Sequence, residues 1–415
     1  MPTLPDFFIL KARVVVTMDG PPIENGAVAV DGNAIAAVGK HEDLHWLQAG
    51  PVFDLGDVAL MPGLINAHCH LDYTMMRHAI NPPKSFTAWV QRINALKRSL
   101  DSDDYLRAIH KGFGFLKKSG TTTVCNVESF PELMPSIHEP PIRTWWFYEM
   151  IDIRHRLTTE EVVIGALSFF HNRPTSLSRF GLSPHAPYTA SRRLYELANS
   201  CASTMTMPLT THVAESREEA EMFKDGSGAL FDFMKSIGRP MQDCGKGTPF
   251  SQLWHSGAIN AGWILAHMNE LTEDDFQLLD HLPEGGKPTI VHCPGSHTYF
   301  NHSRFHFRRL HSLGANICVA TDSLASTHSL SLFDELRAVS HAEPWMEPRQ
   351  LLQTVTTNPA RALRREQRLG KIAPGALADL ITVPVKGPLE SVFEEILDFR
   401  QTVPWMMING QIVSP

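Results

Sequence analysis

Eight apolar, strand-like runs alternate with helix-period segments between about residues 58 and 365, and this alternation limits the fold more than any other feature. The runs are VALMPGLINAH, GTTTVCNV, IRTWWFYEMI, RFGLSPHA, PLTTHVA, GWILAHM, PTIVHCP and ANICVATDS. Helical periodicity predicts helices over 191–203, 216–237, 272–280, 304–313 and 330–339. The stretch GRPMQDCGKGTPFSQLWHSGAINA, before the sixth run, is expected to be an inserted loop. Eight strand–helix units of this total length predict an α/β chain with a (β/α)₈ barrel.

The two ends of the chain have a different pattern from the middle. Apolar and polar residues alternate between glycines in FFILKARVVVTMDG, GAVAVDGNAIAAVG and VFDLGDVALMPG, which is typical of short antiparallel strands. GKIAPGALADLITVPV and VPWMMINGQIVSP, near the other end, share this pattern. We therefore expect a small composite β-sandwich from residues 1–58 and 370–415, attached to a barrel over 59–369.

Charge, hydropathy and cysteine usage exclude several classes of protein. The net charge is −7 and the pI is about 6.3, whereas a nucleic-acid-binding surface would be basic. The sequence has no apolar run long enough to span a membrane and no signal-peptide pattern. Six scattered cysteines without a CxxC pair favour a reduced, cytoplasmic protein. A small-molecule substrate is expected, and a homodimer is the default assembly because two-fold dimers are the commonest oligomers.

Potential metal ligands and catalytic groups stand at the ends of most strand-like runs. Active sites of such barrels lie at the carboxyl ends of the strands, so these side chains are expected to meet there. A single histidine at one strand end is more often structural than functional, but the repetition over six strands favours a common site. The residues are His68, His70, His185, His212, His267, His292 and Asp322.

One divalent metal ion is the expected cofactor. Side chains alternate across a strand, so His68 and His70 share a face, and Cys69 between them is expected to pack away from the ion. Imidazoles and one carboxylate with an open water position are the usual plan of a catalytic zinc site, for which we expect His68, His70, His212 and Asp322 as ligands. Zn²⁺ is favoured, and Fe²⁺ or Mn²⁺ would also fit.

Glu215 follows His212 by three residues, where a strand gives way to a loop or helix. A carboxyl there can carry a proton between a metal-bound water and a substrate nitrogen. Alone, it would be read as a first-turn glutamate favoured by the helix dipole. Its place beside His212 favours the catalytic role.

At this point six motifs can be compared with a known family. The sequence contains PGLINAHCHLD, SPHAPYT, THVAES, AHMNEL, VHCPGSH and ATDSLAS in this order. They resemble the amidohydrolase superfamily, in its branch of aromatic aminohydrolases and chlorohydrolases that holds cytosine, guanine and S-adenosylhomocysteine deaminases. The resemblance covers nearly the whole chain. It implies a distorted TIM barrel with a composite sandwich and a metal-dependent hydrolase.

The resemblance also implies roles for individual residues. Asp322 would take a proton from the attacking water, Glu215 would protonate a ring nitrogen, and His267 would polarise the attacked centre or the water. His185 would contact the substrate. RFGLSPHA lacks the lysine that often bridges a second metal, so one ion is expected, and Glu149 is interpreted as a pocket or structural residue.

Further substrate contacts are expected from the same motifs. Ser323 belongs to the eighth-strand motif, and His297 stands where many members carry asparagine. Trp89 could form an aromatic wall over a purine or ribose, although its spacing from Phe86 equally suits the core of an amphipathic helix. The remaining histidines are expected to be structural or solvated: His292, His302, His306 and His311.

The favoured function is hydrolytic deamination of a heteroaromatic amine by hydroxide generated at the metal. HCHLDYT, FTAWVQRINALKR and TDSLAS look most like deaminases of adenine nucleosides, such as aminodeoxyfutalosine deaminases. Alternatives are an S-adenosylhomocysteine/methylthioadenosine or guanine deaminase, or a cyclic-amide hydrolase or chlorohydrolase; Glu215 counts against dechlorination. A non-catalytic binding protein is disfavoured because no expected ligand or acid–base residue is missing. The cytidine-deaminase fold is excluded, since its PCxxC motif is absent.

Overall fold

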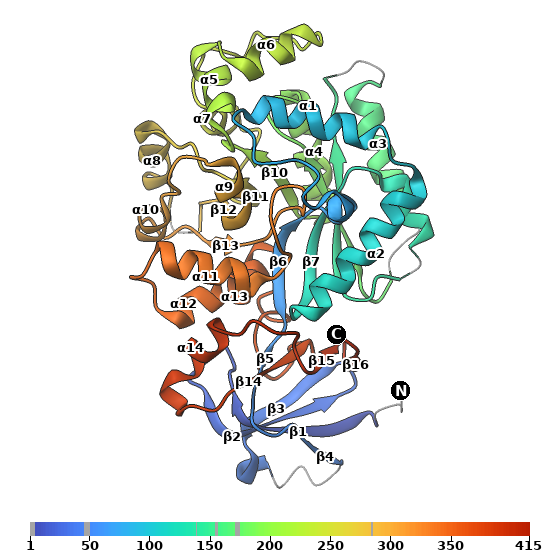
Figure 1. The fold of residues 1–415 in the computed structure, drawn as a ribbon, viewed down its shortest axis with the longest axis vertical. Helices are drawn as coiled ribbons and strands as arrows, with labels where there is room; N and C mark the ends of the chain where they lie inside the picture. Colours follow the sequence, from blue (N-terminus) through green and yellow to red (C-terminus); the bar gives the residue numbers. More distant parts are fainter. Residues whose placement is uncertain (1–4, 45–49, 138, 154–156, 171–174, 284) are drawn as a thin grey trace.

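The structure is a computed structural model that describes residues 5–44, 50–137, 139–153, 157–170, 175–283 and 285–415. Two hydrogen-bonded sheets organise these residues. The middle of the chain forms a barrel surrounded by helices, and strands from both ends form a smaller sheet beside it (Figure 1). The expected α/β fold, a distorted barrel with a module built from both ends of the chain, is confirmed.

The barrel sheet contains eight parallel strands in sequence order. A bridge between Cys69 and Asp322 brings the last strand back to the first, and the Asp322 amide donates a hydrogen bond of 3.2 Å to the His68 carbonyl. The strands are β6 (Leu64–Cys69), β7 (Thr121–Glu128), β8 (Arg143–Met150), β9 (Ser178–Pro184), β10 (Leu209–Val213), β11 (Trp263–His267), β12 (Thr289–His292) and β13 (Ile317–Val319).

Helices cover the outside of the barrel and its upper rim in Figure 1. Several begin with a serine, threonine or aspartate whose side chain accepts a backbone N–H, as at Ser85, Asp101 and Ser191. The α-helices are α1 (Phe86–Lys97), α2 (Ser102–Lys118), α3 (Thr159–Phe170), α4 (Arg192–Met205), α5 (Arg217–Asp225), α6 (Ala229–Ser236), α7 (Pro249–His255), α8 (Glu273–Asp280), α9 (Pro294–Phe300), α10 (Phe307–Ser312), α11 (Leu332–Ala342), α12 (Pro348–Gln353), α13 (Thr357–Ala362) and α14 (Val392–Leu397). The 3₁₀ helices are η1 (His41–Leu44), η2 (Leu71–Met76), η3 (Pro131–Ser136) and η4 (Leu389–Ser391).

The terminal sheet joins strands from the two ends of the chain. β1 pairs antiparallel with β2 but parallel with β4 and β5, which differs from the expected all-antiparallel module. β14 pairs antiparallel with β5, and this contact links the two chain ends. The strands are β1 (Phe7–Val15), β2 (Ile23–Asp31), β3 (Ala34–Lys40), β4 (Val52–Asp54), β5 (Val58–Pro62), β14 (Leu380–Pro384), β15 (Met406–Ile408) and β16 (Gln411–Val413).

One expected barrel strand is in fact two strands in different sheets. The run VALMPGLINAH breaks at Gly63, so β5 belongs to the terminal sheet and only β6 to the barrel. A Cβ on Gly63 would lie 2.1 Å from the Thr122 side chain, which makes glycine necessary at this crossing. The chain therefore passes from the terminal sheet to the barrel sheet within a single apolar run, and the sequence pattern does not mark this change.

The helix predictions hold with two corrections. The segment 216–237 forms α5 and α6 rather than one helix, because Gly226 and Gly228 adopt φ values of +64° and +94° between them. The segment before the sixth barrel strand, expected as a loop, contains α7, which is capped by Thr248 and starts at Pro249.

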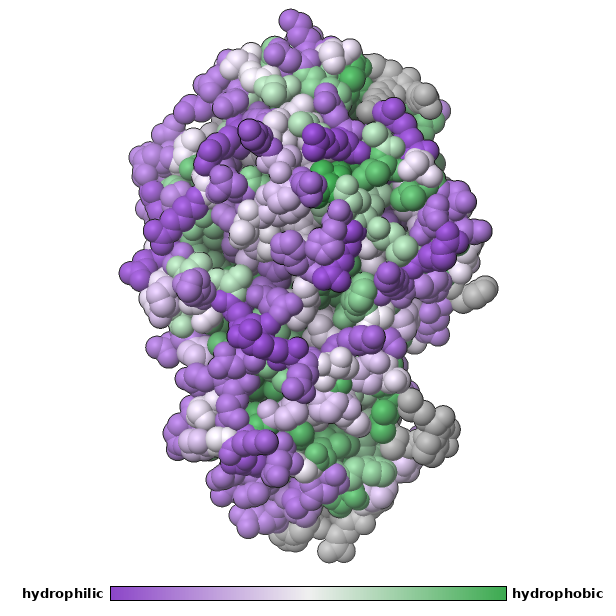
Figure 2. Space-filling view, viewed as in Figure 1, coloured by the Kyte–Doolittle hydropathy of each residue, from purple (hydrophilic) through white to green (hydrophobic). Residues whose placement is uncertain are grey.

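The surface is predominantly hydrophilic in the view of Figure 2, with hydrophobic areas over the terminal strands and near the upper part of the barrel. Val52 and Phe53 of β4 are among the exposed large hydrophobic residues. Among the described residues, no helix is long and apolar enough to cross a membrane.

Candidate active site

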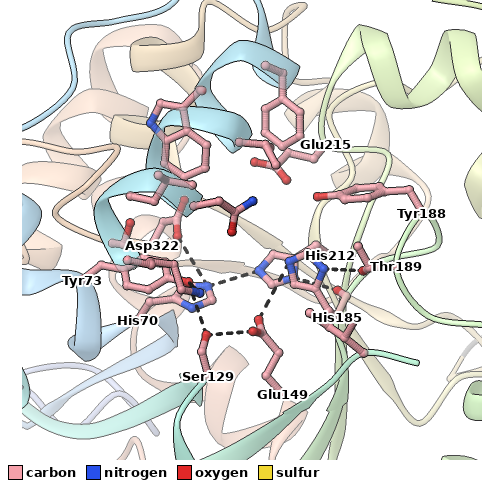
Figure 3. Close-up of a pocket in the computed structure, with 18 of the residues that line it drawn as sticks. His70, Tyr73, Ser129, Glu149, His185, Tyr188, Thr189, His212, Glu215 and Asp322 are labelled. Carbon is pink, nitrogen blue, oxygen red and sulfur yellow. Dashed lines mark hydrogen bonds and ion pairs between the residues drawn. The ribbon is translucent and has the colours of Figure 1, made fainter. Parts of the chain in front are cut away.

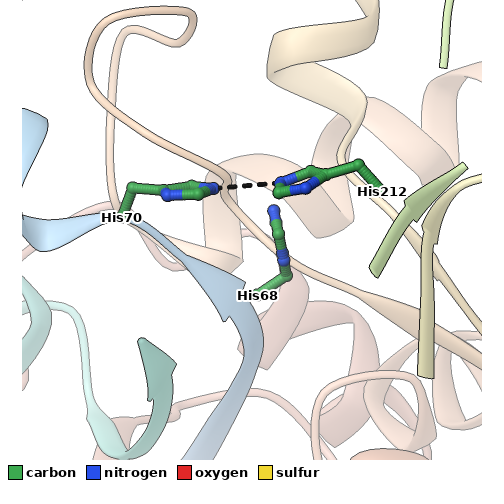
Figure 4. Close-up of side chains that lie close together, drawn as sticks. All are labelled: His68, His70 and His212. Atoms are coloured by element: carbon green, nitrogen blue, oxygen red, sulfur yellow. Dashed lines mark hydrogen bonds between the residues drawn. The ribbon is translucent and has the colours of Figure 1, made fainter. Parts of the chain in front are cut away.

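Three imidazoles converge at the carboxyl ends of β6 and β10. His68 lies in β6, His70 directly follows it, and His212 lies in β10 (Figure 4). A ligand atom from each lies within 4.8 Å of those of the other two, and the Nε2 atoms of His70 and His212 are 3.2 Å apart. Cys69, in contrast, packs in the hydrophobic core and its sulfur accepts a hydrogen bond from the Thr321 hydroxyl.

Asp322, three residues after the last barrel strand β13, completes this group. Its Oδ1 atom lies 3.9 Å from His68 Nε2 and 3.8 Å from His70 Nε2, and its Oδ2 accepts a hydrogen bond of 3.1 Å from Ser326. Asp322 has φ of +58°, a strained conformation that a non-glycine residue adopts only when its surroundings enforce it. The backbone hydrogen bond to His68 supplies such a constraint.

The donor atoms fit one divalent ion. Two ligands at about 2.1 Å from a tetrahedral metal are about 3.4 Å apart, and the separations of 3.2, 3.8 and 3.9 Å lie around this value. Both ring nitrogens of His68 are buried without a hydrogen-bond partner, an arrangement that is costly unless a ligand satisfies it. His212 Nδ1 lies 2.8 Å from the His185 carbonyl, so it carries the proton and Nε2 offers its lone pair.

The surroundings of His68 and His70 favour their neutral forms. Burial, and secondarily the neighbouring histidines, holds the pKa of His68 and His70 well below the ordinary value. Burial likewise raises the pKa of Asp322. Neutral imidazoles are the form that binds metal, so this environment favours coordination at neutral pH.

Glu215 and His267 face each other beside the imidazoles. Glu215 Oε1 lies 3.8 Å from His267 Nε2, and both residues are buried. Burial first, then Asp322 and Glu219, raises the pKa of Glu215 well above its ordinary value, which favours the acid form that can donate a proton. Burial also lowers the pKa of His267 far below its ordinary value, and its backbone has φ of +76°.

These groups line a cavity of about 330 Å³ (Figure 3). One side is aromatic and aliphatic: Trp89 of α1 packs edge-on against Phe300 at 5.0 Å and stacks at 6.2 Å on Phe86. Trp89 thus both lines the cavity and packs with its neighbours. Ser323 and His185 also line the cavity.

The other side of the cavity is polar. Lys97 Nζ donates to the Tyr73 hydroxyl at 2.6 Å, and Ser129 donates to Glu149 Oε2 at 2.8 Å. Glu149 Oε1 lies 3.9 Å from His185 Nε2, and the Tyr73 and Ser129 oxygens are 3.3 Å apart. Burial raises the pKa of Glu149, but His185 and then Lys97 outweigh it, so the net shift is downward and the carboxylate is ionised.

The polar side was largely missed by sequence reasoning. Glu149 was noted as a strand-end residue, but Lys97, Tyr73 and Ser129 were not singled out. Ser129 directly follows β7, and the position of a polar residue after a barrel strand was the signal available for it. Lys97 lies at the end of a helix, where a lysine is usually solvated.

The structure places His297 away from the described lining of the cavity. Its Nδ1 lies 3.1 Å from Asn269 Oδ1, and its ring packs edge-on against His292. His292 in turn stacks on Phe305 with ring centroids 3.9 Å apart, in keeping with the structural role expected for it.

Comparison with known proteins gives a consistent result. The amidohydrolase family profile matches residues 59–413. The chain is 27% identical to a 5-methylthioadenosine/S-adenosylhomocysteine deaminase of Pyrococcus furiosus, over 98% of this chain and 94% of that protein. It is also 27% identical to an aminodeoxyfutalosine deaminase of Deinococcus radiodurans, over 86% and 85%.

A solved structure agrees in fold. An adenosine deaminase from Xanthomonas campestris with bound zinc superposes with a TM-score of 0.83 at 24% identity, covering 99% of this chain and 93% of that one. The six motifs, the barrel and the family match agree with one another. The chain belongs to the amidohydrolase family and is a metal-dependent hydrolase that acts on carbon–nitrogen bonds other than peptide bonds.

Proposed function

We propose that this chain is a hydrolytic deaminase of a heteroaromatic amine, and that its substrate is an adenine nucleoside of the aminodeoxyfutalosine type. The observation that carries the proposal is the buried Glu215 carboxyl, which lines the same cavity as His70, His212 and Asp322 and whose pKa burial raises well above its ordinary value. Deamination of a ring needs a nucleophilic water and a proton for a ring nitrogen, and the site has groups for both.

In this proposal His68, His70, His212 and Asp322 hold one divalent ion, with zinc favoured. When bound, the ion lowers the pKa of a coordinated water and so makes hydroxide accessible at neutral pH. Bound zinc in the Xanthomonas campestris protein supports this choice of metal. Fe²⁺ and Mn²⁺ fit the same donor atoms.

Different residues around the ion carry out the separate proton transfers. Glu215 donates its proton to the ring nitrogen next to the attacked carbon, because the raised pKa keeps it in the acid form. Asp322 accepts a proton from the attacking water, and neutral His267 hydrogen-bonds the reacting centre. Ammonia leaves after the proton has reached the exocyclic nitrogen.

The cavity supports a nucleoside rather than a free base. Its volume of about 330 Å³ lies at the small end of the usual range for ligand sites, and it has both an aromatic side and a polar side. Trp89 would lie against the purine ring. Ser323 and His185 are proposed as further substrate contacts, and the ionised Glu149 can accept hydrogen bonds from sugar hydroxyls. The role of His297 stays a prediction.

Ammonia release by the zinc-loaded protein tests this proposal. The panel holds aminodeoxyfutalosine, S-adenosylhomocysteine, methylthioadenosine, adenosine, guanine and cytosine. We expect kcat/KM for one adenine nucleoside to exceed that for guanine and cytosine by at least about 100-fold, a gap of about 2.7 kcal/mol. Equal activity on free bases, or activity only on cyclic amides or chlorinated rings, would contradict it.

Three expectations, on domain division, cellular location and assembly, remain proposals. A division into residues 1–58 with 370–415 and a barrel over 59–369 is supported by the separate terminal sheet, with β5 lying at the border. A cytoplasmic location is supported by free cysteines throughout. A homodimer rests on the general prevalence of two-fold assemblies.

A further inference from the structure

A second cavity, of about 470 Å³, lies at the junction between the barrel and the terminal sheet. It is at the opposite end of β8 from the candidate active site: Arg143 begins this strand, and Glu149 near its other end lies about 20 Å away at 3.3 Å per residue. Four arginines line it, together with Asn33 and Asn409 from turns of the terminal sheet. The arginines are Arg143, Arg179, Arg365 and Arg368.

A buried ion pair forms one wall of this arginine cavity. Arg143 donates from Nε and Nη2 to the two carboxylate oxygens of Asp379 at 2.8 and 3.0 Å. Both side chains are buried, at 3% and 5% exposure. The Asn409 backbone amide also donates to Asp379 at 2.7 Å, and Arg143 is the one cation that pairs with this carboxylate among the described residues. Asp379 therefore neutralises Arg143 alone.

The other three guanidinium groups have no carboxylate partner among the residues that the structure describes. Arg365 and Arg368 make no side-chain hydrogen bond or ion pair with any residue that the structure describes. Arg179 directs Nη1 to the carbonyl oxygens of Thr175, Ser176 and Ser178, which leaves its Nε and Nη2 without a partner among the described residues. The cavity thus gathers three uncompensated positive charges.

Like charges this close repel one another. Partial burial and then the charges of Arg143 and Arg365 lower the pKa of Arg179. Glu366 lies in the same turn as Arg365 and Arg368 but pairs with neither in the described structure. Because these arginines repel one another, an anion that binds between their guanidinium groups would stabilise the folded state.

The backbone holds the exposed arginines in place. The Arg365 amide donates to the Ala360 carbonyl at 2.7 Å, and the Arg368 amide donates to the Arg365 carbonyl at 2.8 Å. The Leu377 amide donates to the Arg368 carbonyl, which ties this turn to the entry of the terminal sheet. Leu369 and Leu377 line the cavity and belong to a hydrophobic cluster of the barrel. The guanidinium groups are therefore presented from an ordered turn.

We propose that the arginine cavity binds a small oxyanion with two or more negative charges, such as phosphate or a phosphorylated metabolite. Arginine matches phosphate oxygens with paired N–H donors, and several arginines around one concave space favour a multiply charged ligand. The bound anion would contact β9, the turn after α13 and the terminal sheet at once, and so would stabilise their junction.

Isothermal titration of inorganic phosphate into the zinc-loaded full chain tests this site. The double variant Arg365→Gln/Arg368→Gln removes two exposed side chains and should fold normally. We expect saturable binding of one phosphate to the wild type and at least a tenfold weaker affinity in the double variant. Arg193→Gln, which alters an exposed arginine on α4 outside the cavity, should bind phosphate as the wild type does. Phosphate should also raise the Tm of the wild type by about 2 °C.

The control arms separate this site from the metal centre and from longer polyanions. Sulfate should compete with phosphate, and zinc content should be equal in all variants. Phosphate binding that persists unchanged in the double variant would place the anion elsewhere and overturn the proposal. The absence of saturable binding to the wild type would also overturn it, as would binding of a phosphodiester oligonucleotide without binding of phosphate.

Discussion

At the scale of single residues, burial sets the chemistry of the site. Glu215 and His267 are 3.8 Å apart, yet the pKa of the acid is raised and that of the imidazole is lowered. Burial therefore favours the neutral form of both groups, so the pair is not an ion pair. This distribution favours a proton on the Glu215 carboxyl, from which the proposed deamination would protonate a ring nitrogen.

Glu215→Gln tests the proton transfer directly. Glutamine keeps the size and one carbonyl oxygen but cannot donate an acidic proton, so kcat should fall by about 10³-fold while zinc content stays at the wild-type level. Steady-state ammonia release and metal analysis measure both. Glu221→Gln, on the exposed face of α5, is the matched control and should be unchanged. Near-normal turnover in Glu215→Gln would remove this residue from the mechanism.

Cys69 and His68 are adjacent but face different surroundings. Cys69→Ala should keep zinc and activity and lose about 1 kcal/mol of unfolding free energy, because only core packing is removed. His68→Ala should lose zinc, since it removes a buried donor with no other partner. Metal analysis and urea unfolding measure the two effects. A loss of zinc in Cys69→Ala equal to that in His68→Ala would show that the thiol is a ligand.

At the scale of elements, a contact between two helices positions the aromatic side of the cavity. Glu218, in the first turn of α5, accepts the backbone N–H groups of Phe86 and Thr87 at 3.0 and 2.8 Å, where α1 begins. A carboxylate at a helix N-terminus is favourable because it satisfies unpaired donors and the helix dipole. The contact fixes the helix that carries Trp89.

Glu218→Ala should loosen α1 without touching the metal ligands. We expect KM for the nucleoside to rise about fivefold or more, with a smaller change in kcat, because the wall against the substrate becomes mobile. Steady-state kinetics separate the two parameters, and Glu221→Ala on the same helix is the control. A fall in kcat with KM unchanged would contradict the assigned positioning role.

A buried carboxyl links α9 to α11. Glu335 of α11 accepts the Gly295 amide at 2.7 Å near the start of α9, and Thr327 donates to it at 3.4 Å. Burial raises the pKa of Glu335 to about 8. The folded state therefore keeps this proton between the ordinary pKa near 4.5 and about 8, while the unfolded chain loses it, so the stabilisation declines as pH rises through this window.

Glu335→Gln should remove this pH dependence. Glutamine can keep the bond from Gly295 and donate to Thr327, so the variant should become more stable relative to wild type as pH rises from 5 to 8. The relative gain should be on the order of a few kcal/mol. Urea unfolding at the two pH values measures it. Parallel stability profiles for the two proteins would show that Glu335 does not titrate as assigned.

The elements were predicted from sequence better than the contacts between them. The alternation of strand and helix patterns marked every barrel strand, since each pattern is local to the segment that forms it. The split at Gly63 could not be seen, because β5 and β6 are both buried and differ only in which sheet they join. The break between α5 and α6 was also not predicted, because it depends on the positive φ values that two glycines adopt in the folded chain.

At the scale of the whole molecule, barrel closure creates the site. Residues 68, 212, 215 and 322 are distant in sequence, and they could be grouped in advance only because parallel strands of a barrel end at one face. On the polar side of the cavity only Glu149 was noted from the sequence, and Lys97, Tyr73 and Ser129 were not predicted, for a physical reason. The members of this side come from a helix, a 3₁₀ segment, a loop and a strand, and no spacing rule connects them.

The measurement that tests the central claim most directly is ammonia release from aminodeoxyfutalosine by one preparation, first stripped of metal and then reloaded with zinc. We predict negligible release from the stripped protein and recovery that reaches a plateau at one zinc per chain, because three imidazoles and Asp322 form one site. Full release by the metal-free protein, or a plateau only at two ions per chain, would contradict the account.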